Sequence, residues 1–346
     1  MIPDLPPPTL RLRIDEAALA SNWHTLDQMS GSAKAGAAVK ADGYGLGVER
    51  VIPVLRKAGA EDFFVAHWCE VPAVLAHIPA AMLSVLHGPL TAKDARYARE
   101  TGVRPVINSL HQARLWLESG GGRCDLMVDS GINRLGIATH EIADPLIARL
   151  EIDTLMSHLA SADEDSPMNA RQLAAFRQVV QHLPARRTSL ANSAGIALGE
   201  DYAFGLTRPG LALYGGIPRP ELEGVIRQVA FPQAAVLQLR NLNAGDSVGY
   251  NATFTASEPM RVAVVSLGYA DGFLRCRGPD SALLHEGREL PILGKVSMDM
   301  IVVDCANAPD LRDGDWLNVA QHLPDSSRDS GLSQYELLTL TGRRFR

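Results

Sequence analysis

The stretch AAVKADGYGLG, residues 37–47, decides between two α/β folds. Its first four residues, three apolar ones followed by Lys40, are typical of a short buried strand, and the rest is a glycine-rich turn. The turn does not have the G-x-G-x-x-G spacing with which a doubly wound, dinucleotide-binding sheet opens its first helix. The stretch therefore favours the other common fold of parallel strands, a closed barrel.

The same alternation of strand and helix extends outward from this stretch. Apolar runs recur through residues 10–215 at intervals of roughly 20 to 35 residues, the length of a β-then-α unit. The first amphipathic stretch follows Asp15 and places Leu19, Trp23 and Leu26 on one helical face. After residues 37–40, strands are expected at 63–66, 82–86, 103–107, 124–129, 154–159, 188–192 and 211–214. Eight such units predict an α/β fold with a (β/α)8 TIM-type barrel.

The pattern changes at a proline-containing connection, residues 217–223. Beyond it, strands alternate with turns and few helices, which predicts a mainly β domain. Strands are expected at 236–239, 262–267, 283–284 and 301–303, and a terminal helix at 333–341. We therefore expect a barrel domain at 10–223 and a C-terminal β domain at 224–346, with residues 1–9 as a candidate addition to the second.

Composition excludes several classes of protein. The 346 residues carry 33 basic and 39 acidic side chains, a formal net charge of −6, which argues against sequence-independent binding of nucleic acid. No uncharged apolar run reaches the roughly 18 residues that a membrane span needs, and the N-terminus does not resemble a secretory signal. The four cysteines are far apart, and the histidines have no metal-site spacing. We expect a cytoplasmic protein with free thiols and no bound metal.

Chemistry in such a barrel belongs at the C-terminal ends of the strands. Lys40 closes the first strand, Arg134 follows the fifth, His158 lies in the sixth, Ser193 follows the seventh and Arg208 opens the eighth. A lysine that is partly desolvated there has a lowered pKa, and its neutral amine can form a Schiff base with an aldehyde. Position alone leaves open the alternative that Lys40 simply extends into water.

Two further segments lie after the expected seventh strand and at the start of the expected eighth. Residues 192–195 (NSAG) and 208–210 (RPG) offer a hydroxyl and exposed backbone N–H groups where barrels commonly hold phosphate, although both segments also suit ordinary turns. Together with an amine that can form an imine, they indicate a phosphorylated aldehyde, pyridoxal phosphate. In the β domain, Tyr269 and Met298 would by themselves be core side chains.

These segments resemble the alanine racemases, a family of pyridoxal-phosphate enzymes. The matching stretches run in the family's order and are residues 14–15, 22, 38–45, 128–136, 157–160, 191–195, 208–215, 266–272 and 298–299. The resemblance implies a homodimer in which each active site combines a barrel from one subunit with Tyr269 and Met298 from the other. It implies interconversion of L-alanine and D-alanine, which supplies D-alanine for peptidoglycan.

The resemblance also implies a role for each matching residue. Lys40 would hold the cofactor as a Schiff base and, with Tyr269, would act as one of two bases on the imine that the substrate forms with the cofactor. Arg134 and Met298 would position the substrate carboxylate. The remaining cofactor contacts would come from Tyr44, His158, Ser193, Arg208, Gly210 and Leu211.

The chain departs from the family at several positions. Some members carry a carbamylated lysine where this chain has Met127, and we expect Asn133 with a bound anion to replace it beside Arg134. Ser189 replaces a histidine that lies near Arg208 in some members, and a phosphate-binding tyrosine near the C-terminus has no counterpart.

Three other functions remain open. Related racemases act on serine or on many amino acids, and Asn251 stands where we expect a glycine near the entrance. Small pyridoxal-phosphate carriers share the barrel and its lysine but lack the second domain. Amino-acid decarboxylases share the two-domain plan, but their glycine-rich phosphate loop is not found in this sequence.

Overall fold

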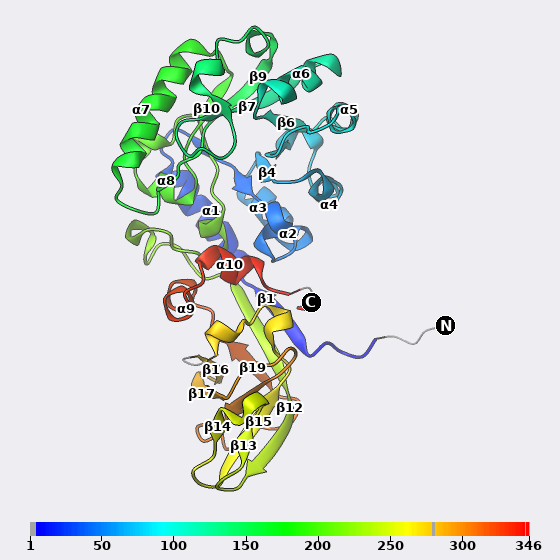
Figure 1. Cartoon of the computed structure of the whole chain (residues 1–346), viewed down its shortest axis with the longest axis vertical. Coiled ribbons are helices and arrows are strands. Elements are labelled where there is room, and N and C mark those ends of the chain that lie inside the picture. The colour runs from blue at the N-terminus through cyan, green and yellow to red at the C-terminus, as the bar shows by residue number, and fades with distance from the viewer. Residues whose placement is uncertain (1–4, 279–280, 343, 346) are drawn as a thin grey trace. The chain divides into compact units, whose positions relative to one another are not determined.

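The computed structural model describes residues 5–278, 281–342 and 344–345, and it divides into two compact units (Figure 1). One unit is Glu16–Arg227; the other combines the described residues before Glu16 with those from Gln228 onward. The expected ranges of 10–223 and 224–346 differ from these units at residues 10–15 and at residues 224–227. Strand β1 (Leu10–Ile14) belongs to the second unit because it pairs antiparallel with β12 (Ala230–Leu242).

Within the described residues, eight parallel strands close a barrel. β2 (Lys34–Ala35) continues across Gly36 into β3 (Ala37–Ala38), so that this first strand pairs with the last on one side and the second on the other. The others, in order around the barrel, are β4 (Phe63–Val65), β5 (Leu83–Val85), β6 (Arg104–Ile107), β7 (Arg123–Asp129), β9 (Glu151–Met156), β10 (Arg187–Ser189) and β11 (Leu206–Thr207). A short extra strand, β8 (Ile137–Ala138), pairs only with β7.

Backbone hydrogen bonds between the last two strands complete the circle. The N–H of Gly205 donates to the carbonyl of Thr188 (3.0 Å), and the N–H of Arg208 donates to that of Ala191 (2.9 Å). The predicted (β/α)8 barrel is therefore confirmed, and the open doubly wound sheet is excluded.

Helices follow the strands as the alternation predicts (Figure 1). Leu19, Trp23 and Leu26 are buried along the first helix, and Asn22 on the same face donates to the carbonyls of Leu213 (3.1 Å) and Arg227 (2.8 Å). The helices of this unit are α1 (Glu16–Met29), α2 (Lys40–Tyr44), α3 (Val48–Ala58), α4 (Val71–Leu75), α5 (Ala92–Thr101), α6 (Leu110–Glu118), α7 (Pro167–His182) and α8 (Ser193–Ala197).

The expected eighth strand at 211–214 is wrong. Leu206–Thr207 forms that strand, and Leu211–Tyr214 is a short 3-10 helix, η6. All four residues of η6 are buried, and the Tyr214 hydroxyl donates to the carbonyl of Ala38 (2.8 Å). A short buried apolar run is equally compatible with a strand and with a helix that is covered on all sides. The shift places Arg208 and Gly210 after the eighth strand, which is the end where chemistry is expected.

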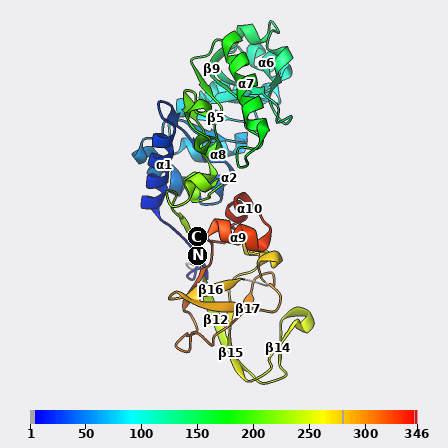
Figure 2. The ribbon, with the colours of Figure 1, turned by 90° about the vertical axis from the view of Figure 1, so that its left-hand side faces the viewer.

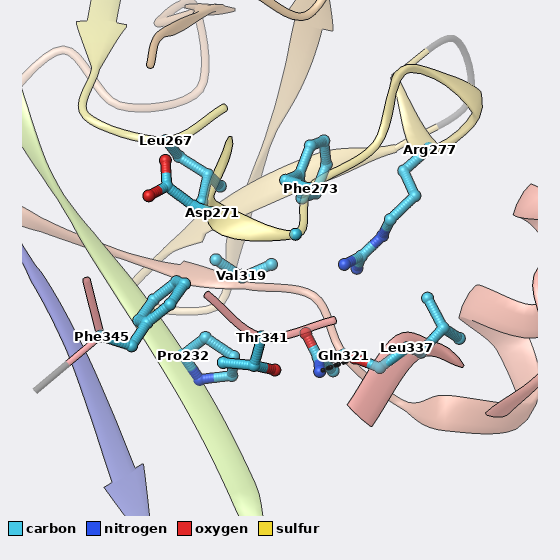
Figure 3. A pocket seen from close by; sticks show the side chains of 11 residues that line it. Pro232, Leu267, Asp271, Phe273, Arg277, Val319, Gln321, Leu337, Thr341 and Phe345 are labelled. Carbon is cyan, nitrogen blue, oxygen red and sulfur yellow. Dashed lines mark hydrogen bonds between the residues drawn. The ribbon is translucent and has the colours of Figure 1, made fainter. Parts of the chain in front are cut away.

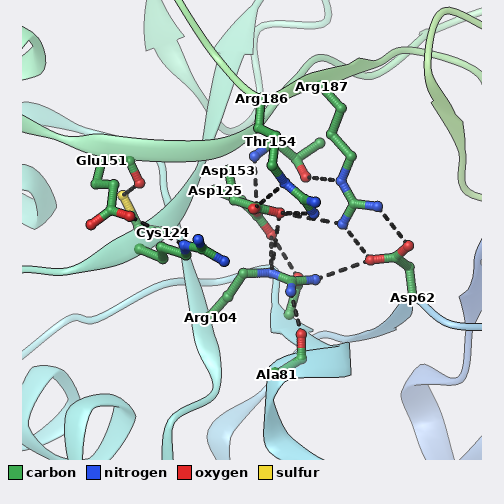
Figure 4. Close-up of polar contacts among 12 residues, drawn as sticks. Asp62, Ala81, Arg104, Cys124, Asp125, Glu151, Asp153, Thr154, Arg186 and Arg187 are labelled. Atoms are coloured by element: carbon green, nitrogen blue, oxygen red, sulfur yellow. Dashed lines mark hydrogen bonds and ion pairs between the residues drawn. The ribbon is translucent and has the colours of Figure 1, made fainter.

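A network of ion pairs, buried or partly buried except for Arg186, lies toward the N-terminal ends of the barrel strands (Figure 4). Arg104 donates to Asp62 (3.1 Å), and the Nη1 of Arg187 donates to the other oxygen of Asp62 (2.7 Å). The Nε of Arg104 lies 3.6 Å from a carboxylate oxygen of Asp125, and Arg186 donates to Asp153 (2.7 Å). The paired charges offset the large cost of burying each one alone.

The C-terminal unit is built on a seven-stranded antiparallel sheet. Its order is β1, β12, β15 (Met260–Val265), β18 (Ile301–Asp304), β17 (Arg288–Leu293), β16 (Ala282–His285) and β19 (Trp316–Val319), and β19 returns to pair with β12. A hairpin of β13 (Ser247–Val248) and β14 (Phe254–Thr255) and the helices α9 (Leu323–Ser330) and α10 (Gln334–Thr339) complete the unit, as Figure 2 shows in part. No helix among the described residues is long and apolar enough to cross a membrane.

Candidate active site

Lys40 opens an unusual turn at the end of the first barrel strand. The turn is the short element α2 (Lys40–Tyr44), yet Ala41, Asp42, Gly43 and Tyr44 all have positive φ, between 54° and 63°. The left-handed conformation costs roughly 1 to 2 kcal/mol for each residue other than glycine. This turn therefore needs support from its surroundings.

The Lys40 amine lies among positively charged groups. Its side chain is half-buried, and burial lowers the pKa of Lys40. The guanidinium groups of Arg134 and Arg208 lower it further, whereas the carboxylate of Glu70 raises it. A lowered pKa increases the fraction of neutral amine, which is the form that attacks a carbonyl.

Ser193 and Gly210 form a close cradle beside this turn. The Ser193 hydroxyl oxygen accepts hydrogen bonds from the N–H groups of Gly210 (3.0 Å) and Ala212 (3.1 Å), so its own proton is available to a ligand. A Cβ at Gly210 would lie only 2.1 Å from the hydroxyl oxygen of Tyr44, so this close approach requires glycine. Hydroxyl groups and backbone N–H groups of this kind suit a phosphate.

Arg208 is buried next to this cradle. Its guanidinium donates to the carbonyl oxygen of Ser157 (2.5 Å) and to the hydroxyl of Ser189. Burial lowers the pKa of Arg208 to about 10, so the group remains charged at neutral pH. His158 differs, because burial and the charges of Arg208, Arg134 and Lys40 lower its pKa to about 3. His158 is therefore a neutral ring at neutral pH.

The segment around Arg134 is more open. Met127 is buried in β7, whereas Asn133 and Arg134 are exposed in the loop that follows this strand. The backbone N–H of Asn133 donates to Asp129 (3.2 Å), and its side-chain amide donates to the carbonyl of Gly131 (3.4 Å). These contacts fix the loop from which Arg134 extends.

Tyr269 and Met298 lie on two linked loops of the C-terminal unit. The N–H of Tyr269 donates to the carbonyl of Ser297, and that of Ala270 to the carbonyl of Met298, both at 3.0 Å. A Cβ at Gly268 would lie 2.2 Å from the Met298 carbonyl oxygen, so glycine is required for this contact. Tyr269 is half-buried, and Met298 is 53% exposed.

A hollow lies behind these loops, lined only by residues of the C-terminal unit (Figure 3). Buried Arg277 faces it, donates to the carbonyl of Ala320 (3.1 Å) and lies 4.4 Å from the centre of the Phe273 ring. Burial lowers the pKa of Arg277 to about 10, which leaves it charged at neutral pH. None of the residues predicted for the site lines this hollow.

The barrel strands thus bring together most of the side chains that the sequence singles out. The residues at the C-terminal ends of the barrel strands are Lys40, Tyr44, His158, Ser193, Arg208, Gly210 and Leu211, with Arg134 in a neighbouring loop. Sequence reasoning missed Glu70, which is close enough to Lys40 to influence its charge. The available signal was an acidic residue three positions after His67, the spacing of a capping box at the start of a helical turn.

Models of both halves of one family match the chain. The model described as the N-terminal domain of alanine racemase matches residues 14–218, and the model described as its C-terminal domain matches residues 229–346. The chain belongs to the alanine racemase family. Since alanine racemases are isomerases and this chain has both of their domains, the pyridoxal-phosphate carrier alternative, which lacks the second domain, is excluded.

Individual alanine racemases match over almost their whole length. Two proteins of Agrobacterium fabrum, named as biosynthetic and catabolic alanine racemases, are 37% and 39% identical to this chain; each match covers 97% of this chain, and 92% and 90% of the relatives. The crystal structure of alanine racemase from Bartonella henselae with covalently bound pyridoxal phosphate superposes with a TM-score of 0.90. It is 35% identical and the match covers 98% of this chain and 99% of that one.

Proposed function

We propose that this chain is a pyridoxal-phosphate-dependent alanine racemase that interconverts L-alanine and D-alanine. The observation that carries the proposal is the half-buried Lys40, whose pKa is lowered, at the end of a barrel strand in a chain of this family. A half-buried amine with a lowered pKa is suited to covalent attachment of an aldehyde. The relative from Bartonella henselae supports this choice of cofactor, because its structure is described with covalently bound pyridoxal phosphate.

The residues around Lys40 fit this cofactor. In the proposal, Lys40 would hold the cofactor through its aldehyde, and the hydroxyls of Ser193 and Tyr44 and the backbone at Gly210 and Leu211 would hold its phosphate. The buried, charged Arg208 would hold the ring nitrogen of the cofactor, and the neutral His158 would provide a further contact to it. When bound, the cofactor withdraws electrons from the substrate Cα and makes the Cα proton acidic enough to be removed.

Racemisation requires a proton acceptor on one face of Cα and a proton donor on the other. We assign one face to Nζ of Lys40 and the other to the hydroxyl oxygen of the partner subunit's Tyr269. Burial and the charges of Arg134 and Arg208 favour the neutral Lys40 amine, which is the form that can take a proton. In the reverse direction the protonated amine returns it, so the same two groups serve both enantiomers.

The substrate is oriented through its carboxylate. Arg134 is exposed on the loop after β7, where its guanidinium can form two parallel hydrogen bonds to a carboxylate. The backbone N–H of the partner subunit's Met298 supplies a further donor. Fixing the carboxylate determines which two faces of Cα are presented to the two proton carriers.

The proposal includes a homodimer and a biosynthetic role. Tyr269 and Met298 belong to the C-terminal unit, and exposed Met298 and Met300 (53% and 45%) offer apolar surface beside Tyr269 for a second copy of the chain. The product D-alanine would supply peptidoglycan. Growth of a D-alanine-requiring bacterium that carries this gene tests that role, and failure to grow despite racemase activity in its extract contradicts it.

The deciding experiment follows L-alanine in D2O with purified full-length chain and pyridoxal phosphate. We expect optical rotation to fall to zero while deuterium enters Cα, and we expect L-serine to react more slowly. A protein that stays colourless when the cofactor is supplied, or that exchanges no Cα proton, contradicts the proposal. Faster racemisation of serine than of alanine would support the broad-range alternative instead.

A further inference from the structure

The carboxylate of Glu70 connects two adjacent strand ends of the barrel. Its Oε1 accepts a hydrogen bond from the N–H of Ala41 (2.6 Å), the residue directly after Lys40. Its Oε2 accepts two more, from the N–H groups of Ala66 (2.9 Å) and His67 (2.8 Å), which follow β4. One side chain thus joins the Lys40 turn to the end of the neighbouring strand.

Backbone hydrogen bonds also hold the Lys40 turn, but the N–H of Ala41 is bound by the side chain of Glu70. Elsewhere in the turn, Asp42 accepts from the N–H of Val48 (3.0 Å), and the carbonyls of Val39 and Ala41 accept from Gly43 and Gly45 (both 2.9 Å). Ala41 itself has a φ of 54°, a conformation that L-residues other than Asn and Asp seldom adopt. A charged acceptor gives stronger hydrogen bonds than a neutral one, so Glu70 is well suited to hold Ala41 in this conformation.

Glu70 also differs in charge from the other groups that face Lys40. Arg134 and Arg208 are cationic and disfavour a proton on the Lys40 amine. His158 is neutral because its pKa is about 3, and the pKa of His87 is lowered by burial and by neighbouring His67 and Lys40. Among the described groups that act on Lys40, Glu70 supplies the negative charge that favours the protonated amine.

We propose that Glu70 is a positioning residue for Lys40: its carboxylate fixes the turn from which the amine extends and counters the charges of Arg134 and Arg208. The inference rests on the proposed function for the role of Lys40 as a proton carrier. A proton carrier must hold its proton as well as release it, so the balance between Glu70 and the two arginines matters for both directions of the reaction.

The chain offers a matched control for Glu70. Asp94, in the first turn of α5 one strand further along the barrel, accepts from the N–H groups of Leu90 (3.0 Å) and Thr91 (2.9 Å). Its carboxylate therefore holds a loop after β5 in the same way, without acting on Lys40. Replacing Asp94 by Asn tests the effect of losing such a bond at a site outside the proposed machinery.

The test uses the full-length chain without added cofactor, in the wild type and the Glu70→Gln, Glu70→Ala and Asp94→Asn variants. The pH dependence of Lys40 acetylation by acetic anhydride, followed by mass spectrometry, gives the protonation midpoint of the amine. We expect Glu70→Gln to lower this midpoint by about 1 pH unit, which is about tenfold in the fraction of neutral amine below the midpoint. Hydrogen exchange in residues 39–47 should become faster in both Glu70 variants.

Asp94→Asn should accelerate exchange only near residues 90–95 and leave the Lys40 midpoint unchanged. If Glu70→Gln has the wild-type midpoint and the wild-type rate of hydrogen exchange at residues 39–47, the inference is wrong. The Glu70→Gln variant alone is sufficient for this test, so the result does not depend on whether Glu70→Ala folds. Neither readout requires substrate or cofactor. A chain that does not racemise alanine would therefore contradict the proposed function without affecting the result for Glu70.

Discussion

His158 links the charge pattern of the site to the pH dependence of folding. Its folded pKa of about 3 lies below the ordinary value of 6.5, because burial and three neighbouring cations oppose protonation. Above pH 6.5 the ring is neutral in both the folded and the unfolded chain, so it does not affect stability. As the pH falls from 6.5 toward 3, the unfolded chain binds a proton that the folded chain does not, and stability is lost progressively.

We therefore expect His158→Gln to flatten the acid side of the stability curve. The free energy of unfolding of the wild-type chain should fall by about 1 to 2 kcal/mol more than that of the variant between pH 7 and pH 5. Urea denaturation of the cofactor-free chain at several pH values measures this difference. His111→Gln, at an exposed position of α6, is the control, and equal slopes for all three proteins would refute the expected role of His158.

Single residues of the candidate site could be predicted where the fold associates their position in the barrel with chemistry. Lys40, Ser193 and Arg208 follow or close barrel strands, and the end of a strand is where a barrel places its chemistry. Glu70 was not predicted, because an acidic residue in the first turn of a short helix is usually a cap and nothing more. Its importance depends on the left-handed turn at Ala41, and sequence pattern does not reveal positive φ at an alanine.

Two loops of the C-terminal unit are joined by one side chain near the C-terminus. The Nε of Arg344 lies 2.7 Å from a carboxylate oxygen of Asp271, and its Nη1 donates to Asp299 at the same distance. Asp271 follows Tyr269 by two residues, and Asp299 follows Met298 directly. Arg344 thus connects the two loops whose residues are proposed to enter the partner's site.

We expect Arg344→Ala to loosen these loops and slow racemisation. Hydrogen exchange in residues 268–272 should become faster, and kcat/KM for alanine should fall about tenfold, which corresponds to about 1.4 kcal/mol of transition-state stabilisation. Arg288→Ala is the matched control, since Arg288 also bridges two carboxylates of this unit, those of Asp310 (2.7 Å) and Glu286 (3.2 Å). Equal effects of the two substitutions, or none from Arg344→Ala, would rule out a specific role for Arg344.

The elements that the sequence predicted well are those with a periodic pattern or strong end signals. Residues 16–29 form a helix with the expected buried face, and the strand at residues 124–129 is correct to within one residue. The prediction of the eighth strand was wrong because Leu206–Thr207 is too short to have a recognisable pattern. The buried residues of η6 have the apolar sequence of a strand instead. Sequence pattern also did not predict the partner of β1, because the pairing of β1 with β12 joins residues more than 200 positions apart.

At the scale of the whole molecule, the proposal makes each active site the product of two copies of the chain. Lys40 belongs to the barrel unit and Tyr269 to the C-terminal unit. If each site takes its lysine from one subunit and its tyrosine from the other, then two inactive variants can restore one another in a mixed dimer. A site completed within one chain cannot be restored in this way.

The test mixes Lys40→Ala with Tyr269→Phe in equal amounts under conditions that allow subunits to exchange. Random pairing makes half of the dimers mixed, and each mixed dimer has one site with both residues and one with neither. Activity should therefore rise from near zero to about a quarter of that of the same amount of wild-type chain. Mixing each variant with a Lys40→Ala, Tyr269→Phe double variant is the control, because no pairing in those mixtures assembles a site that has both groups. Mass spectrometry of the intact dimers checks that exchange has occurred, so that mixed dimers without activity would mean that the two proton carriers come from the same chain.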